Sequence, residues 1–207
     1  SEWTLSSLYS IFSSRYPVTH GYCDLQNLAP TDWGESTGSL AEILRSHGYS
    51  TMACSTAKAF TPAFGAHAGF SRFFYDTYPE SGRTSRLITG RAIDHLEANP
   101  RGKNFLFLHY IDTHEPWSDP SYSENCFADP IRTIDPFLEY SPLKTGPGDT
   151  KAEPIFNRES IEVLDRRLAL RVKEVDLHLQ SLFGYLEAKG QEDRTAVILT
   201  SDHGPAY

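Results

Sequence analysis

The residues best suited to chemistry lie near the end of the chain, where Asp202 and His203 follow an apolar run and precede Gly204. The run at 196–199 has the composition of a strand that is buried on both faces, as in the middle of a parallel sheet. Ligands of open α/β sheets bind beyond the carboxyl ends of the strands. A carboxylate beside an imidazole suits a divalent metal ion. Taken alone, however, the Ser-Asp-His-Gly sequence is more typical of a turn.

A second polar cluster follows another apolar strand, which the sequence predicts at 104–110. His109, Asp112 and His114 fall within six residues of one another. Two imidazoles and a carboxylate could bind a second metal ion or hold substrate oxygens. Because His109 continues the strand, a position in the core is slightly favoured for it. His114 lies beyond the strand, and a functional role is favoured there.

The third candidate is Thr4, which precedes a helix predicted at 5–16. Backbone N–H groups and the helix dipole stabilise an anion at such a position. A threonine hydroxyl there can also simply cap the helix, which is its usual role. Beside a metal ion the hydroxyl becomes a nucleophile, because coordination lowers its pKa. The spacing alone leaves both roles open.

The elements that must position these residues alternate between helices and buried strands. Helices are predicted at 5–16, 39–48, 85–98 and 160–188. Strands are predicted at 50–54, 104–110 and 196–201. Residues 57–79 are aromatic and glycine-rich and are predicted to form a loop. Alternation of this kind predicts the α/β class, as a three-layer sandwich with a mostly parallel sheet flanked by helices.

The longest predicted helix has apolar residues three and four positions apart throughout, and Gly190 follows its end. This spacing predicts a buried face and a solvated face. The buried face comprises Leu164, Leu168, Val175, Leu179 and Leu182, and the solvated face comprises Arg166, Arg167, Lys173 and Glu174.

Domain organisation follows from length and from the distribution of proline. The 207 residues are expected to form a single, partial domain, because the chain starts at Ser1 without methionine and stops shortly after Gly204. Residues 117–157 contain six prolines and little periodicity, which predicts a surface excursion. The three cysteines are widely spaced and indicate neither a zinc ribbon nor a disulfide scaffold, so the compartment stays open.

Charge and hydropathy exclude two classes of partner. The net charge is −8, and Lys and Arg do not cluster, so no nucleic-acid partner is expected. No apolar run is long enough for a transmembrane segment. If the substrate is an anionic ester, a bound cation must offset the acidic protein locally.

Five segments of the chain carry a resemblance to a known family in their order and spacing. They are residues 3–21, 39–44, 69–70, 105–117 and 175–204. Together they resemble the sulfatase family of the alkaline phosphatase superfamily. The first segment is similar to that family's nucleophile segment, the fourth to its strand with a His-x-Pro turn, and the last to its long helix and metal-binding strand. The resemblance implies an alkaline-phosphatase-like α/β fold that is incomplete here.

The resemblance also implies roles for individual residues. Thr4 occupies the position of the catalytic nucleophile and, as an alkoxide, of a metal ligand. Asp202 and His203 occupy metal-ligand positions, and His114 matches a catalytic histidine near the transferred group or a second metal. The implied cofactor is a divalent metal ion, Zn²⁺, Mn²⁺ or Ca²⁺, and the implied substrate is a phosphate or sulfate ester.

One departure from the family pattern bears on the reaction. Sulfatases that use formylglycine carry it on a Cys or Ser followed by Pro and Arg, whereas these positions here are Thr4, Ser6 and Leu8. The departure favours a threonine nucleophile acting on phosphate esters or transferring phospho-groups. The alternatives are an atypical sulfuric ester hydrolase and a catalytically silent binding module. The family's strand with paired metal-binding acids is expected before Ser1, so the 207-residue fragment is expected to be inactive although its parent is an enzyme.

Overall fold

The computed structural model describes residues 4–21, 38–57, 60–75, 84–114 and 158–204 of the 207-residue chain. It divides the chain into two compact units. The first contains Ser1–Ile111 together with His178–Tyr207, and the second contains Asp112–Leu177. Each unit is described by itself. None of the described helices is both long enough and apolar enough to span a membrane.

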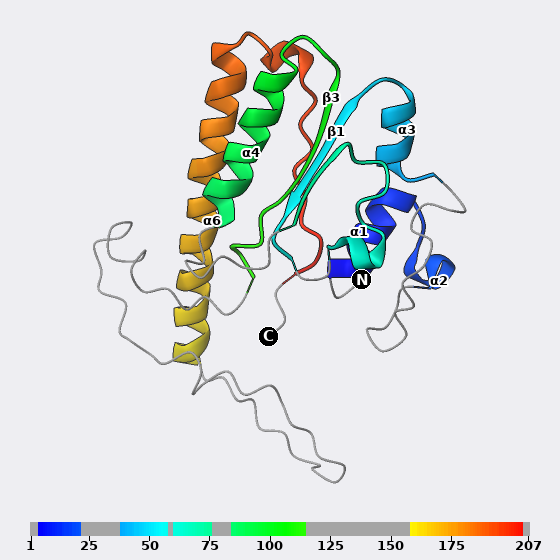
Figure 1. Ribbon diagram of the computed structural model, residues 1–207. Helices are drawn as coiled ribbons and strands as arrows, with labels where there is room; N and C mark the ends of the chain where they lie inside the picture. The colour runs from blue at the N-terminus through cyan, green and yellow to red at the C-terminus, as the bar shows by residue number, and fades with distance from the viewer. Residues whose placement is uncertain (1–3, 22–37, 58–59, 76–83, 115–157, 205–207) are drawn as a thin grey trace. The chain divides into compact units, whose positions relative to one another are not determined.

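The first unit is built on a three-stranded parallel sheet in the order β2-β1-β3. The strands are β1 (Ser50–Ser55), β2 (Arg72–Tyr75) and β3 (Asn104–His109). β1 is the central strand, and five of its six residues are buried, whereas every residue of β3 is half-buried. A parallel sheet that is covered by helices confirms the predicted α/β class (Figure 1).

Helices cover both faces of this sheet (Figure 1). The helices are α1 (Thr4–Ser13), α2 (Pro17–His20), α3 (Leu40–Ser46), α4 (Thr84–Ala98) and α6 (Arg158–Ala188), with short 3₁₀ turns η2 (Pro62–Phe64) and η4 (Glu192–Arg194). A capping box opens α3, since Ser39 Oγ accepts from the Glu42 backbone N–H at 3.2 Å and the Glu42 carboxylate accepts from the Ser39 N–H at 2.6 Å.

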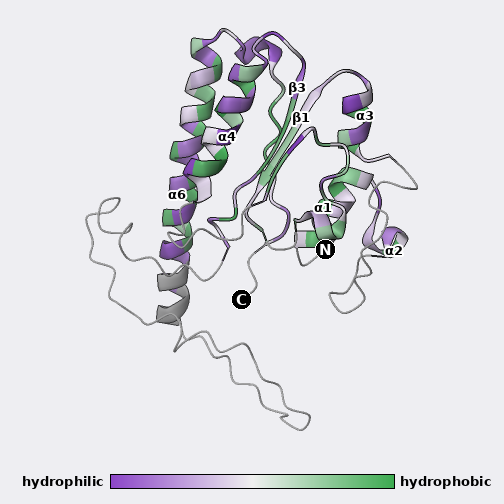
Figure 2. Ribbon diagram, in the orientation of Figure 1, coloured by the Kyte–Doolittle hydropathy of each residue, from purple (hydrophilic) through white to green (hydrophobic). Residues whose placement is uncertain are grey.

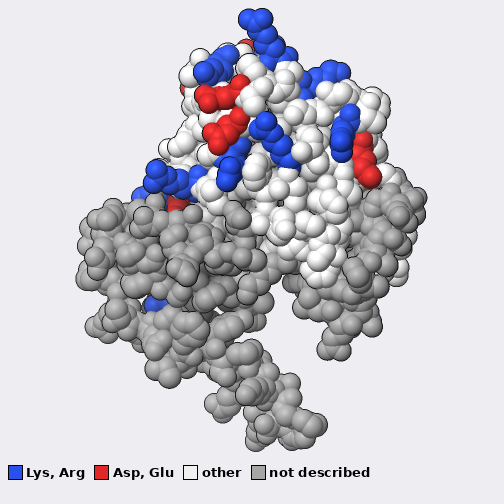
Figure 3. Space-filling view, in the orientation of Figure 1, with Lys and Arg blue, Asp and Glu red and all other residues white. Residues whose placement is uncertain are grey.

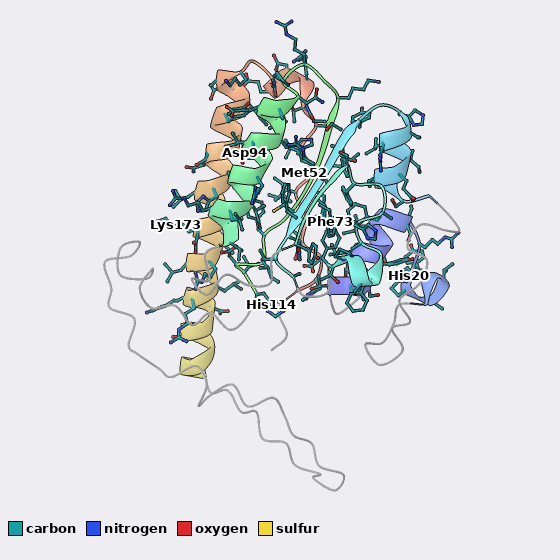
Figure 4. All side chains as sticks on the ribbon, viewed as in Figure 1. His20, Met52, Phe73, Asp94, His114 and Lys173 are labelled. Carbon is teal, nitrogen blue, oxygen red and sulfur yellow. The ribbon has the colours of Figure 1, made fainter. Side chains whose placement is uncertain are left out.

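Two hydrophobic cores lie on the two faces, because alternate residues of a strand point to opposite sides. Met52 of β1 packs with α4 and with the C-terminal part of α6, whereas Ala53 packs with α1 and α3. Figure 4 labels Met52 and also Phe73, which packs against the core that contains Ala53. The apolar and polar residues along α4 can be followed in Figure 2.

Two sequence predictions about strands are wrong. Residues 196–201 form no strand, and no described strand pairs with them, so Val197, Ile198 and Leu199 are 56%, 90% and 77% exposed. An apolar run becomes a buried strand only when neighbouring strands pair with it, and composition alone does not supply those neighbours. The predicted loop at 57–79 contains β2, which pairs with β1.

The predicted faces of α6 are partly confirmed. Leu182 is buried, and Leu168, Val175 and Leu179 are half-buried, whereas the side chain of Leu164 lies outside the described residues. Of the residues predicted to be solvated, Arg166 and Lys173 are exposed and Arg167 is half-buried. Glu174 is only 2% exposed, so the prediction for it is wrong. Its carboxylate accepts a hydrogen bond from Arg171 at 3.0 Å, and this ion pair offsets the cost of burying the charge.

Candidate active site

The site lies in the first unit, at the edge of the sheet where the parallel strands end. Ser55 and His109 are the last residues of β1 and β3, and the register of the two strands places them side by side. Ser55 Oγ lies 2.8 Å from Nδ1 of His109. The other ring nitrogen of His109, Nε2, therefore points toward groups beyond the end of the sheet.

Asp202 meets that imidazole from the C-terminal segment. Its Oδ2 lies 3.7 Å from Nε2 of His109 and 3.6 Å from Nε2 of His203. All three side chains are between 13% and 18% exposed, so a small ion or an ester can reach them. Oδ2 itself is buried and has no hydrogen-bond partner among the described residues. A buried carboxylate oxygen without a partner is costly, and a bound cation or donor would satisfy it.

The pKa of the Asp202 carboxyl is set by opposing effects. Burial alone would raise it. The hydrogen-bonding and charge effects of His109, the charge of His203 and the hydroxyl of Thr4 outweigh burial and lower the pKa from its ordinary 3.8 to about 2. Asp202 is therefore ionised at neutral pH and offers a negative charge at this edge of the sheet.

Thr4 is the first residue of α1 rather than the residue before it, and its hydroxyl reaches the same cluster. Thr4 Oγ1 lies 3.2 Å from Nε2 of His203. On the other side of that ring, Nδ1 lies 2.7 Å from the carbonyl oxygen of Gly204. Since a carbonyl only accepts, Nδ1 carries the hydrogen and Nε2 keeps a lone pair toward Thr4. A hydroxyl that faces such a lone pair is placed as a nucleophile is, next to a group that can act as a base or as a metal ligand.

Of the four residues to which the resemblance assigns roles, three are thus close together, namely Thr4, Asp202 and His203. His114 is exposed and belongs to the second unit, so it is described apart from them. Sequence reasoning missed the position of His109 at this edge because it favoured a core histidine. The available signal was that His109 ends an apolar strand, as Ser55 also does.

The model of one protein family, Sulfatase, matches residues 2–207 of the chain. The chain belongs to the sulfatase family. No curated protein and no solved structure matches it significantly. Membership confirms the resemblance noted in the sequence and supports a hydrolase of the sulfatase and alkaline phosphatase superfamily.

Sulfatases generally use a divalent metal ion. Within the described ranges, no group of three or more His, Cys, Asp or Glu side chains is arranged as a complete metal site. The partial set does fit an ion. Oδ2 of Asp202 lacks a partner, Nε2 of His203 keeps a lone pair, and Thr4 adds an oxygen, with neighbouring donor atoms 3.2 and 3.6 Å apart. Donors that each lie about 2.0–2.2 Å from one Zn²⁺ have spacings close to these.

Proposed function

We propose that the protein is a metal-dependent hydrolase or phospho-group transferase that acts on phosphate or sulfate esters through Thr4 as the nucleophile. The observation that carries the proposal is the contact of the Thr4 hydroxyl with Nε2 of His203, 3.2 Å away, beside the ionised carboxylate of Asp202. A neutral hydroxyl needs such a neighbour to become a nucleophile at neutral pH.

Asp202, His203 and Thr4 are the residues proposed to hold the metal ion, which is Zn²⁺, Mn²⁺ or Ca²⁺. When bound, the ion supplies Lewis-acid activation of the hydroxyl and stabilises charge on the ester. The hydrogen bond from Nδ1 of His203 to the Gly204 carbonyl supports this assignment, because a second hydrogen bond of this kind orients most metal-binding histidines.

The protein's own residues then divide the remaining work. The Thr4 hydroxyl loses its proton to solvent as Oγ1 forms a bond to phosphorus or sulfur; the bond to the leaving oxygen breaks in line, and that oxygen keeps the bonding electrons and takes up a proton from water. His114 stabilises the negative charge on the oxygens that do not leave, and water releases the product from the threonine ester in the second half of the reaction. An anionic substrate also suits a site whose net charge a cation has offset. On the described part of the face shown in Figure 3, Lys and Arg side chains prevail, with some Asp and Glu side chains among them.

The test compares aryl phosphate, aryl phosphodiester and aryl sulfate turnover by the full-length protein with Zn²⁺, Mn²⁺ or Ca²⁺ added in turn. Faster metal-dependent turnover of the phosphate esters is expected. A preference for aryl sulfate would identify an atypical sulfuric ester hydrolase instead. Tight binding of an unhydrolysed ester with no turnover would identify a binding module.

A matched pair of variants tests the nucleophile itself. Thr4→Val keeps the shape of the side chain and removes the hydroxyl, so the rate should fall by about 10³-fold or more. Thr4→Ser keeps a hydroxyl and should retain a measurable part of the rate. Equal rates for Thr4→Val and the unmodified protein would show that another group attacks the ester.

A further inference from the structure

Two imidazoles face the carboxylate of Asp202, and their other ring nitrogens have different partners. Nδ1 of His203 meets a backbone carbonyl, which leaves a lone pair on Nε2 of that ring, toward the Thr4 hydroxyl. Nδ1 of His109 meets a serine hydroxyl, Ser55 Oγ, at 2.8 Å. A hydroxyl can donate or accept, so the hydrogen on His109 depends on what else Ser55 binds.

The second contact of Ser55 decides the direction of that hydrogen bond. The backbone N–H of Ala57 donates to Ser55 Oγ at 3.1 Å, and Ser55 is fully buried. With this donor already directed at its oxygen, the hydroxyl hydrogen of Ser55 is best placed on Nδ1 of His109. The ring hydrogen of neutral His109 then lies on Nε2.

The carboxylate on the opposite side of the ring favours the same arrangement. Nε2 of His109 faces Oδ2 of Asp202 at 3.7 Å, and the oxygens of a carboxylate only accept hydrogen bonds. An N–H directed at a carboxylate is attractive, whereas a lone pair directed at it is repulsive. At His203 this preference is outweighed, because the carbonyl oxygen of Gly204 lies only 2.7 Å from Nδ1, whereas Oδ2 of Asp202 lies 3.6 Å from Nε2. Both neighbours of His109 therefore select the tautomer that carries hydrogen on Nε2.

We infer that Ser55 fixes His109 as the Nε2–H tautomer, which makes His109 a positioning residue that orients Asp202 and not a metal ligand. His203 holds the opposite tautomer and is the imidazole that is free to bind a cation. The tautomers rest on the hydrogen-bond geometry alone, whereas the positioning role rests on the metal site proposed above.

The tautomers can be read directly from the ¹⁵N NMR signals of the ring nitrogens of the metal-free protein at pH 8. His109 should carry hydrogen on Nε2, and His203 should carry it on Nδ1. Ser55→Ala should shift His109 toward a mixture of the two tautomers. Hydrogen mainly on Nδ1 of His109 in the unmodified protein would overturn the inference, and this result needs neither the variant nor any turnover.

The positioning role is tested by the affinity of the protein for Zn²⁺ and Mn²⁺, measured by calorimetry. His109→Ala should weaken binding by about 10–100-fold, as losses of such orienting residues do. His109→Gln keeps an N–H donor for Asp202, so its affinity should stay within about threefold of the unmodified protein. Equal losses in both variants would identify His109 as a ligand, and no loss in either would show that it has no role; both results overturn the inference.

The two experiments separate this inference from the proposed function. If the unmodified protein binds no ion, the metal site and the positioning role are both wrong, while the NMR result still decides the tautomers. If it binds an ion and His109→Ala has full affinity, the metal site stands and only the role of His109 is overturned.

Discussion

The two ends of β1 carry the same pair of residues in different surroundings. Ser50, its first residue, lies 3.2 Å from Nε2 of His95 through its hydroxyl, and Ser55, its last residue, lies 2.8 Å from Nδ1 of His109. His95 is 2% exposed, and its Nδ1 has no hydrogen-bond partner in the described part of the chain. The far side of His109 faces a carboxylate instead.

The comparison teaches that a serine–histidine contact is not itself a sign of chemistry. Burial has the largest effect on the pKa of His95 and lowers it; the hydrogen bond to the Ser50 carbonyl raises the pKa by less, and the charge of Arg72 lowers it further, so the pKa lies below its ordinary value. His95 is thus a neutral residue inside the fold. His109 differs because it lies at the carboxyl edge, where parallel strands deliver ligand-binding groups, and because Asp202 lies opposite it.

Removing the charge of Asp202 should give the largest difference in ester turnover between variants at the two ends of β1. Asp202→Asn should lower ester turnover by about 10³-fold, because the proposed metal site loses its charged ligand. His95→Gln, at the opposite end of β1, should leave the rate of the folded enzyme within about twofold. Steady-state kinetics at saturating metal, normalised to the folded fraction, make the comparison. A comparable loss in both variants would mean that the two ends do not differ in function.

The acid stability of the protein should also depend on Asp202. Its folded-state pKa of about 2 lies below the ordinary 3.8, so the ionised carboxylate stabilises the fold above about pH 4. This contribution, roughly 2 kcal/mol, is lost as pH falls toward 2. Urea unfolding of the metal-free protein should show that Asp202→Asn has a flatter stability profile over this range. An unchanged slope would show that the imidazoles do not lower the pKa of Asp202.

His95 should affect stability at higher pH and in the same direction. Its pKa lies below the ordinary 6.5, so the unfolded chain takes up the proton more readily than the folded one. The stabilising effect of the neutral ring is complete above about pH 6.5 and is lost as pH falls below it. His95→Gln should remove this part of the pH dependence of unfolding. The pKa of His20 is also lowered, so the part of the pH dependence that His20 contributes should remain in the variant and serves as an internal control.

Local sequence patterns predicted most of the helices well. The three-and-four spacing placed α4 and α6 to within two residues of their bounds, because that periodicity is a property of the segment itself. β2 was missed, since four residues in an aromatic, glycine-rich stretch become a strand only through pairing with β1. The apolar run at 196–201 was wrongly predicted to be a strand for the converse reason. Its composition suits a buried strand, but no described strand pairs with it.

The same limit applies to the site. Thr4 could be singled out because it lies at the start of a helix, and Asp202 because it stands beside His203 after an apolar run, although that run forms no strand. Their catalytic and metal-binding roles stay predictions. The partnership of Ser55 with His109 depends on the register between β1 and β3, which joins residues 54 positions apart. No local pattern records that register, so sequence reasoning could only weigh His109 as an isolated residue.

The smallest expected effects come from the two serines, and they test the comparison most directly. Ser50→Ala and Ser55→Ala make the same chemical change at the two ends of one strand. Ser50→Ala should cost about 1 kcal/mol of unfolding free energy, the usual value of one hydrogen bond, and leave metal affinity unchanged. Ser55→Ala should have a similar cost in stability and should also weaken Zn²⁺ or Mn²⁺ binding, because His109 then loses the group that fixes its tautomer. Denaturant melts and calorimetric titrations of both variants give the four values needed. If both serines changed metal affinity equally, the effect would come from general loosening of β1, and the distinction between its two ends would fail.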